Sequence, residues 1–103
     1  MVKVKNLNNT SGKQPKGYDT WLEFWEGKTG KKANHCGATD CDVKGRDKLV
    51  GAHVKKVGAG DDSHYITPLC RGCNQRDDEF YVDTELVHAE SRQSLYLAAM
   101  LAP

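Results

Sequence analysis

Four cysteines, arranged as two close pairs, constrain the fold of this chain more than any other feature of its sequence. Cys36 and Cys41 are separated by four residues, and Cys70 and Cys73 are separated by two. A turn with roughly two to four intervening residues can direct two thiolates at one tetrahedral ion. The two pairs together predict a single structural zinc site with four cysteine ligands.

Two disulfide bonds are the alternative use of these cysteines. Residues 1–5 are charged and no apolar run follows them, so we expect no signal peptide. We therefore expect a cytoplasmic location, where thiols stay reduced and paired cysteines more often bind a metal. No apolar run approaches the roughly 20 residues of a transmembrane helix, so we expect no membrane partner.

The length of 103 residues predicts one domain, residues 1–103. A hydrophobic content of 38% with 28% charged residues is typical of a folded and rather polar protein. A chain this short buries a modest fraction of its surface. Zinc binding coupled to folding, worth on the order of 10 kcal/mol, would add substantially to its stability.

Positive charge is concentrated in the first half of the sequence. Residues 1–56 contain 12 Lys and Arg against 6 Asp and Glu, whereas residues 57–103 contain 3 against 8. The basic half could contact a phosphate backbone, or its charges could simply interleave with acidic ones on the folded surface. Both interpretations stay open. The candidate nucleic-acid contacts are Lys28, Lys31, Lys32, Lys44, Arg46, Lys55 and Lys56.

Local signals predict two helices. The first covers residues 19–29 approximately, where Thr20 starts a capping box and Gly27 or Gly30 can end the helix. The second covers residues 91–101, which are rich in good helix formers.

Alternation and aliphatic runs predict the strands. We expect strands over residues 2–7, 48–54 and 64–69, the last two forming a hairpin with a long loop. A further helix is expected over residues 73–79, directly after the hairpin. Residues 80–87 could form a short strand or an extended arm.

Two segments resemble the HNH endonuclease family. They are residues 51–54 (Gly-Ala-His-Val) and residues 65–74, which begin with Tyr-Ile-Thr-Pro-Leu and contain the second cysteine pair. A cysteine turn, a hairpin and a helix in this order resemble the treble-clef arrangement. The resemblance implies an α+β fold, a small zinc-bound treble-clef (ββα-metal-like) domain with an added N-terminal helix. Its zinc-binding, HNH-like core would cover residues 33–79, and residues 80–103 would form a C-terminal extension.

The resemblance also implies roles for single residues. His53 lies at the position of the family's general base, and Asn74 lies where a residue helps to hold the catalytic metal. Two polar positions of the family differ here, because Ala52 replaces an acidic metal ligand and Tyr65 replaces an asparagine. A hard cation such as Mg²⁺ or Mn²⁺ prefers carboxylate oxygens, so Asp78, one helical turn beyond Asn74, is the candidate substitute ligand.

Three functions fit these features. We favour a zinc-stabilised, HNH-like protein that associates with DNA or RNA and has weak or no catalytic activity. The second is an active metal-dependent nuclease that hydrolyses phosphodiesters with His53 as general base. The third is a zinc-knuckle adaptor that binds a protein through its acidic second half or through the helix bearing Trp21 and Trp25. These two tryptophans could stack on bases, although a core role is favoured.

Overall fold

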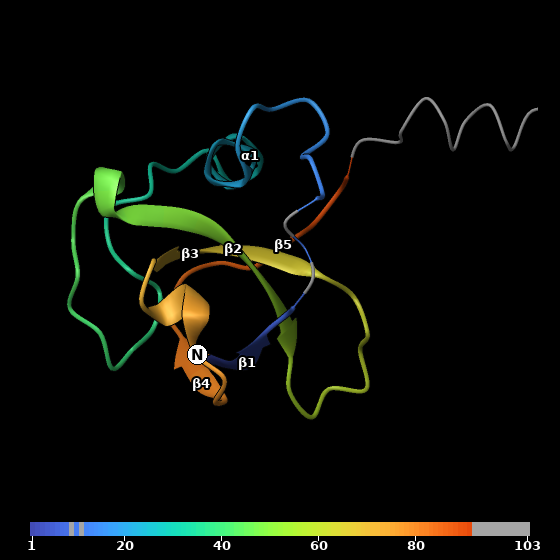
Figure 1. Ribbon diagram of the computed structural model, residues 1–103, viewed down its shortest axis with the longest axis vertical. Coiled ribbons are helices and arrows are strands. Elements are labelled where there is room, and N and C mark those ends of the chain that lie inside the picture. Colours follow the sequence, from blue (N-terminus) through green and yellow to red (C-terminus); the bar gives the residue numbers. More distant parts are fainter. Residues whose placement is uncertain (9, 11, 92–103) are drawn as a thin grey trace, which may run out of the picture.

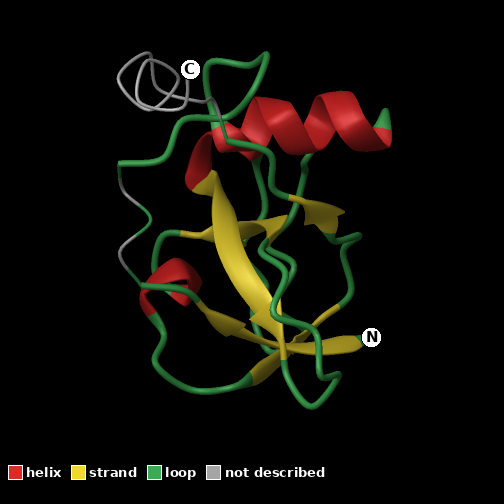
Figure 2. Ribbon diagram, turned by 90° about the vertical axis from the view of Figure 1, so that its right-hand side faces the viewer, coloured by secondary structure: helices red, strands yellow, loops and turns green. Residues whose placement is uncertain are grey.

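The computed structural model describes residues 1–8, 10 and 12–91. Within these residues, five strands form one antiparallel sheet in the order β4-β1-β2-β3-β5, and one α-helix lies across it (Figures 1 and 2). The predicted α+β class is confirmed. The elements in chain order are β1 (Val2–Asn6), α1 (Trp21–Thr29), the 3-10 turn η1 (Arg46–Lys48), β2 (Leu49–Lys56), β3 (Tyr65–Cys70), the 3-10 turn η2 (Cys73–Gln75), β4 (Phe80–Val82) and β5 (Val87–His88).

β1 lies in the interior of the sheet although it begins the chain. It pairs with β2 through Val4 opposite Lys56 and with β4 through Val4 opposite Phe80. Its side chains alternate between the two faces, so that Val4 is fully buried while Lys5 is exposed. The predicted strand over residues 2–7 is confirmed, and it places the start of the chain between two later strands.

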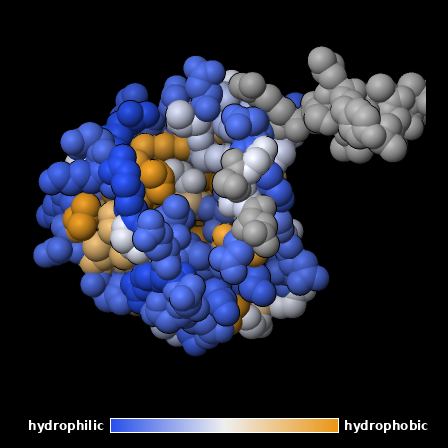
Figure 3. All heavy atoms as spheres, in the orientation of Figure 1, coloured by the Kyte–Doolittle hydropathy of each residue, from blue (hydrophilic) through white to orange (hydrophobic). Residues whose placement is uncertain are grey.

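β2 and β3 form the predicted hairpin. Their register runs from Leu49 opposite Cys70 to Val54 opposite Tyr65. β3 is buried along its whole length, so the second cysteine pair follows a strand that is held on both faces. Figure 3 shows one side of the molecule as mainly hydrophilic, with hydrophobic side chains gathered in and around a central hollow.

α1 begins and ends where its capping residues predict. The Thr20 hydroxyl oxygen accepts the backbone N–H of Glu23, and Gly30 ends the helix with a φ of 71°, a left-handed conformation that suits glycine. The helix packs on β2 and β3. Its buried side chains include Phe24 and Trp25, and Trp25 also donates its indole N–H to the Glu85 carbonyl oxygen at 2.8 Å. The core role favoured for Trp25 is confirmed.

The predicted helix over residues 73–79 is wrong. The chain forms a short 3-10 turn at Cys73–Gln75 and becomes extended at Arg76, with φ −67° and ψ 141°. The cause lies in β1, where the Asn6 amide donates to the carbonyl oxygens of Cys73 at 2.8 Å and Arg76 at 3.1 Å. The Cys73 carbonyl would accept a later backbone N–H in an α-helix, so this contact from a distant strand competes with helix formation.

The C-terminal part of the described chain forms two short strands. β4 and β5 lie at opposite edges of the sheet, so the single strand considered for residues 80–87 is divided between them. The helix predicted over residues 91–101 lies almost entirely outside the described residues. Among the described residues, no helix is both long enough and apolar enough to cross a bilayer.

Replacing Gly51 with alanine tests the contact between α1 and β2. A Cβ at Gly51 would collide with the main chain of Trp21 and lie 2.5 Å from the Leu22 nitrogen. We expect Gly51→Ala to lower the free energy of unfolding by about 1–3 kcal/mol, measured by urea denaturation, because the helix must shift. Gly12→Ala is the control, since no described atom lies within 4 Å of its Cβ. Equal midpoints for the two variants would contradict the close packing.

Candidate metal centre

The first cysteine pair lies in a turn that is fixed by backbone hydrogen bonds. Cys36 N–H donates to the Val43 carbonyl at 2.9 Å, and Cys41 N–H donates to the Ala38 carbonyl at 3.1 Å. Gly37 N–H donates to the Pro68 carbonyl of β3 at 2.8 Å. The turn is thereby attached to the hairpin that carries the second pair.

The second cysteine pair lies where β3 ends. Cys70 is the last residue of β3, and Cys73 begins η2. Two backbone N–H groups donate to sulfur here, Cys70 N–H to Cys36 Sγ at 3.3 Å and Cys73 N–H to Cys70 Sγ at 3.4 Å. Such donors stabilise thiolates, which is the form that binds a metal ion.

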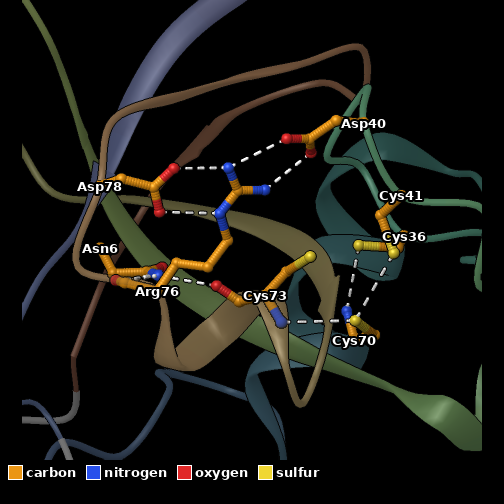
Figure 4. A network of polar contacts seen from close by, with 8 residues as sticks. All are labelled: Asn6, Cys36, Asp40, Cys41, Cys70, Cys73, Arg76 and Asp78. Carbon is orange, nitrogen blue, oxygen red and sulfur yellow. Dashed lines mark hydrogen bonds and ion pairs between the residues drawn. The ribbon is translucent and has the colours of Figure 1, made fainter.

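The structure brings all four cysteines together (Figure 4). Their sulfur atoms lie within 4.8 Å of one another, and Cys41 Sγ is 3.8 Å from Cys70 Sγ. A tetrahedral ion with metal–sulfur bonds of about 2.3 Å requires sulfurs about 3.8 Å apart. All four cysteines are free, so the disulfide alternative is not what the structure shows. The predicted meeting of the four cysteines in one cluster is confirmed, and the cluster could hold a metal ion.

The four thiols would all ionise together only if a cation lay among them. Burial raises the pKa of Cys36, and burial together with the Cys70 thiol raises the pKa of Cys73. Burial alone would raise the pKa of Cys70 as well, but the Cys73 N–H and the neighbouring thiols lower it overall. Several thiolates this close repel one another, so full ionisation requires a positive ion among them.

An arginine joins the two cysteine turns independently of any ion (Figure 4). Arg76 donates to both carboxylate oxygens of Asp40, at 2.7 and 3.0 Å, and its guanidinium lies over the Phe80 ring with 4.3 Å to the centroid. Asp40 precedes Cys41 in the first turn. This bidentate pair lowers the pKa of Asp40, so the carboxylate stays charged at neutral pH.

Asp78, the candidate ligand for a catalytic cation, also pairs with Arg76. Arg76 Nε donates to Asp78 Oδ1 at 2.9 Å, and Arg76 Nη2 donates to Asp78 Oδ2 at 2.6 Å. Because the helix over residues 73–79 is absent, Asp78 and Asn74 do not share a helix face. Asp78 does not line the cavity that Asn74 lines.

His53 and Asn74 meet at a cavity of about 240 Å³. The His53 side chain is buried, with the residue 7% exposed, and its ring packs edge-on against Trp21 with 4.5 Å between centroids. Its Nε2 atom is buried without a hydrogen-bond partner in the described part of the chain. The other described lining residues are Leu7, Thr10, Lys13, Trp21 and Gly51.

The electrostatics of this cavity keep His53 neutral. Burial, followed by electrostatic interaction with Lys13 and His64, lowers the pKa of His53 to about 4. None of the described lining residues carries a carboxylate. The side-chain oxygens that the described lining offers to Mg²⁺ are therefore those of the Asn74 amide and the Thr10 hydroxyl.

Among the basic residues named as candidate nucleic-acid contacts, two pairs of lysines lie in separate places. Lys31 and Lys32 follow α1, where Lys31 pairs with Glu85 at 3.2 Å. Lys55 and Lys56 end β2, and the Lys56 ammonium lies 4.6 Å from the centre of the Tyr65 ring. No cavity described for residues 1–91 is lined by both pairs.

Two features of the site were missed by the sequence reasoning. The Asp40–Arg76 pair had a usable signal, since an acid adjoins Cys41 and a base lies three residues beyond Cys73. The second feature is the position of Lys13 beside His53. No sequence signal indicated it, because Lys13 lies in a polar loop far along the chain from His53.

Comparison with known proteins gives no match to a family model, a curated protein or a solved structure. The resemblance to the HNH family stays a prediction.

We expect one metal ion per chain. Elemental analysis of Cys70→Ser should show that the ion is lost, and a chelator should abolish cooperative unfolding of the unmutated protein, because ion binding and folding are coupled. His35→Ala is the matched control, since His35 adjoins Cys36 but its ring nitrogens face Asn34 and Asp83. An ion retained in Cys70→Ser, or lost in His35→Ala, would contradict the four-cysteine assignment.

The burial of His53 predicts a pH dependence of stability. Between pH 6.5 and about 4 the unfolded chain binds a proton at His53 that the folded protein does not, so the free energy of unfolding falls as the pH falls. The expected loss is on the order of 3 kcal/mol.

The variant His53→Phe keeps a ring against Trp21 but cannot titrate. It should lose less stability than the unmutated protein over the same pH interval in urea denaturation. If the free energies of unfolding of the two proteins fell in parallel with pH, buried His53 would not be the cause of the pH dependence. An NMR titration of His53 with a midpoint at the ordinary histidine pKa of 6.5 would have the same meaning.

Proposed function

We propose that this protein is a zinc-stabilised, HNH-like domain that binds nucleic acid and has weak or no hydrolytic activity. The observation that carries the proposal is the cavity where His53 and Asn74 meet beside Lys13, without a carboxylate in its described lining. It supports phosphate contact and disfavours a hydrolytic metal site.

The ion in the cysteine cluster is zinc in this proposal. Four thiolates in a closed tetrahedral arrangement suit Zn²⁺, whereas Mg²⁺ and Mn²⁺ prefer oxygen ligands. A closed set of four protein ligands leaves no position for substrate. The zinc ion is therefore structural, and any reaction would take place elsewhere.

The order of the elements supports a treble-clef relationship. A cysteine turn, the β2–β3 hairpin and a second cysteine pair at the start of a turn follow one another as in that arrangement. The closing α-helix is reduced here to the 3-10 turn η2. We interpret the domain as a degenerate treble clef.

The cavity offers groups that suit a phosphate. The Lys13 ammonium, the Thr10 hydroxyl and the Asn74 amide can all donate hydrogen bonds. The Lys13 Nζ atom also lies 3.3 Å from His64 Nδ1. Contacts of this kind position a nucleic acid through its backbone and are independent of base sequence.

Weak catalysis follows from the same lining. Phosphodiester hydrolysis needs a cation to offset charge on the leaving oxygen, and that cation needs oxygen ligands. A base is most effective when its pKa is near the working pH, and the pKa of His53 is about 4. His53 therefore resembles a general base in position and is poorly tuned as one.

An active nuclease remains the second candidate, because His53 and Asn74 do line one cavity, as the HNH resemblance implies. Its cofactor would be Mg²⁺ or Mn²⁺. The adaptor hypothesis gains less support from the helix, since Trp25 is buried in the core.

A salt series tests nucleic-acid binding. Fluorescence anisotropy with labelled DNA and RNA oligonucleotides should show affinity that falls as salt rises. Lys13→Gln should weaken binding severalfold, independently of the nucleic-acid sequence. It should also reduce the slope of log affinity against log salt concentration by about one, because one phosphate contact is lost. Lys16→Gln, which removes a charge from the same loop but outside the cavity lining, should change little. The proposal fails if the unmutated protein shows no salt-dependent binding to either nucleic acid.

A plasmid assay separates the two candidates in the same preparation. With Mg²⁺ or Mn²⁺ we expect little or no nicking, equal to that of His53→Ala. Robust nicking that disappears in His53→Ala would establish the nuclease instead.

A further inference from the structure

The register of three neighbouring strands gathers positive charge on one face of the sheet. Lys3 of β1 is directly opposite Tyr81 of β4, and Lys5 of β1 is directly opposite Lys55 of β2. Opposed residues in an antiparallel pair share a face, as do residues two apart along a strand. Tyr81, Lys3, Lys5 and Lys55 therefore form one surface, which we name the lysine face.

The burial pattern confirms that this face points outward. Tyr81, Lys5 and Lys55 are exposed and Lys3 is partly exposed. The alternating residues on the other face are core residues: Val4, Val54, Phe80 and Val82 are buried. The lysine face is thus the solvent side of a sheet whose inner side is well packed.

The helix covers a different part of the sheet. α1 packs on β2, β3 and β5, and its contact with β2 is centred on Gly51, against the main chain of Trp21. β1 and β4 lie at the far end of the sheet from α1 (Figure 1). The lysine face begins where this helical cover ends.

Two like charges oppose each other on this face. Lys5 and Lys55 are a direct cross-strand pair, an arrangement that repels in the free protein. Lys3 reaches Glu79 at 3.9 Å, and Glu79, Asp61 and Asp62 border the depression that Lys5 and Lys55 line. The Asp61 carboxylate accepts hydrogen bonds from the Tyr65 hydroxyl and the Ser63 N–H. A polyanion laid between Lys5 and Lys55 would remove their repulsion.

The exposed ring of Tyr81 indicates that the polyanion is a nucleic acid with unpaired bases. Tyr81 is 46% exposed, and the Lys3 ammonium lies 5.6 Å from its ring centroid. A base can stack on such a ring only when it is unpaired. A duplex groove is usually read by a protruding helix or ribbon, whereas this is an open sheet surface.

We propose that the lysine face binds single-stranded nucleic acid, with phosphates at Lys5 and Lys55 and a base stacked on Tyr81. This inference rests on the proposed function and specifies its partner. Lys3 and Lys5 are about 6.7 Å apart along β1, so successive contacts can follow an extended strand.

The metal centre supports this surface from the side. Thr39 N–H of the first cysteine turn donates to the Tyr81 carbonyl at 2.9 Å, and Asp83 N–H donates to the Gly37 carbonyl at 2.9 Å. The outer edge of β4 is thus paired with the turn between Cys36 and Cys41. Tyr81 is positioned by the same turn that supplies two metal ligands.

The test compares two double variants of equal charge. Lys5→Gln/Lys55→Gln removes the opposed pair, and Lys16→Gln/Lys48→Gln removes two exposed lysines elsewhere. Anisotropy is measured with a labelled 12-nucleotide oligo-dT and with a 12-base-pair duplex. We expect Lys5→Gln/Lys55→Gln to weaken oligo-dT binding about tenfold or more and to reduce the salt slope by about 1.4, the value for two single-strand contacts. Lys16→Gln/Lys48→Gln should stay within about twofold.

Tyr81→Ala should weaken oligo-dT binding by about fivefold or more through lost stacking, with little effect on the salt slope. Metal content and urea midpoints of all variants report on folding.

The experiment distinguishes failure of the proposed function from failure of the lysine-face inference. If the unmutated protein binds no nucleic acid, the proposed function and this inference both fall. If it binds but the two double variants weaken equally, or if the duplex binds more tightly than oligo-dT, the lysine face is overturned while the proposed function stands.

Discussion

The convergence of four cysteine sulfurs is the constraint on which the rest of the structure depends. It joins the turn at residues 36–41 to the end of β3, two segments that a long hairpin separates in the chain. This first cysteine turn also pairs with β4, because the Thr39 N–H donates to the Tyr81 carbonyl, so the turn covers one edge of the sheet. An ion that neutralised the thiolates would therefore stabilise more than its own ligands, because β4 pairs with β1 in the interior of the sheet.

The sequence predicts those parts of the structure that local chemistry determines. Thr20 and Gly30 mark the ends of α1 because an N-cap oxygen and a left-handed glycine act within one helical turn. The cysteine spacing predicts the ligand set because each pair lies in a single turn. The β2–β3 hairpin follows from two aliphatic runs joined by a polar loop. The helix ends and the two cysteine turns each depend on residues that are close together in the sequence, whereas the meeting of the two turns brings distant segments together.

The wrong predictions for residues 73–79 and for Asp78 have a common physical origin, which is a hydrogen bond from a residue far away in the sequence. The backbone after Cys73 could have continued as a helix, but Asn6, 67 residues away, donates to the Cys73 carbonyl beside the Arg76 N–H that closes the 3-10 turn. The same displacement leaves Asp78 with Arg76 rather than with Asn74. Residue pattern alone cannot reveal which carbonyl a side chain in another strand will occupy.

The cavity and the lysine face are connected through the alternation of two strands. Along β1 and its continuation, Lys5 and Leu7 have the same orientation, and along β2 His53 and Lys55 have the same orientation. Leu7 N–H donates to the His53 carbonyl, so the pairing that opposes Lys5 to Lys55 extends to the edge of the cavity. A nucleic-acid strand on the lysine face would be directed towards His53, Asn74 and Lys13. If the lysine face binds a strand as proposed, the pairing of β1 with β2 would guide its backbone to His53, although no described residue that lines the cavity carries a carboxylate for a hydrolytic cation.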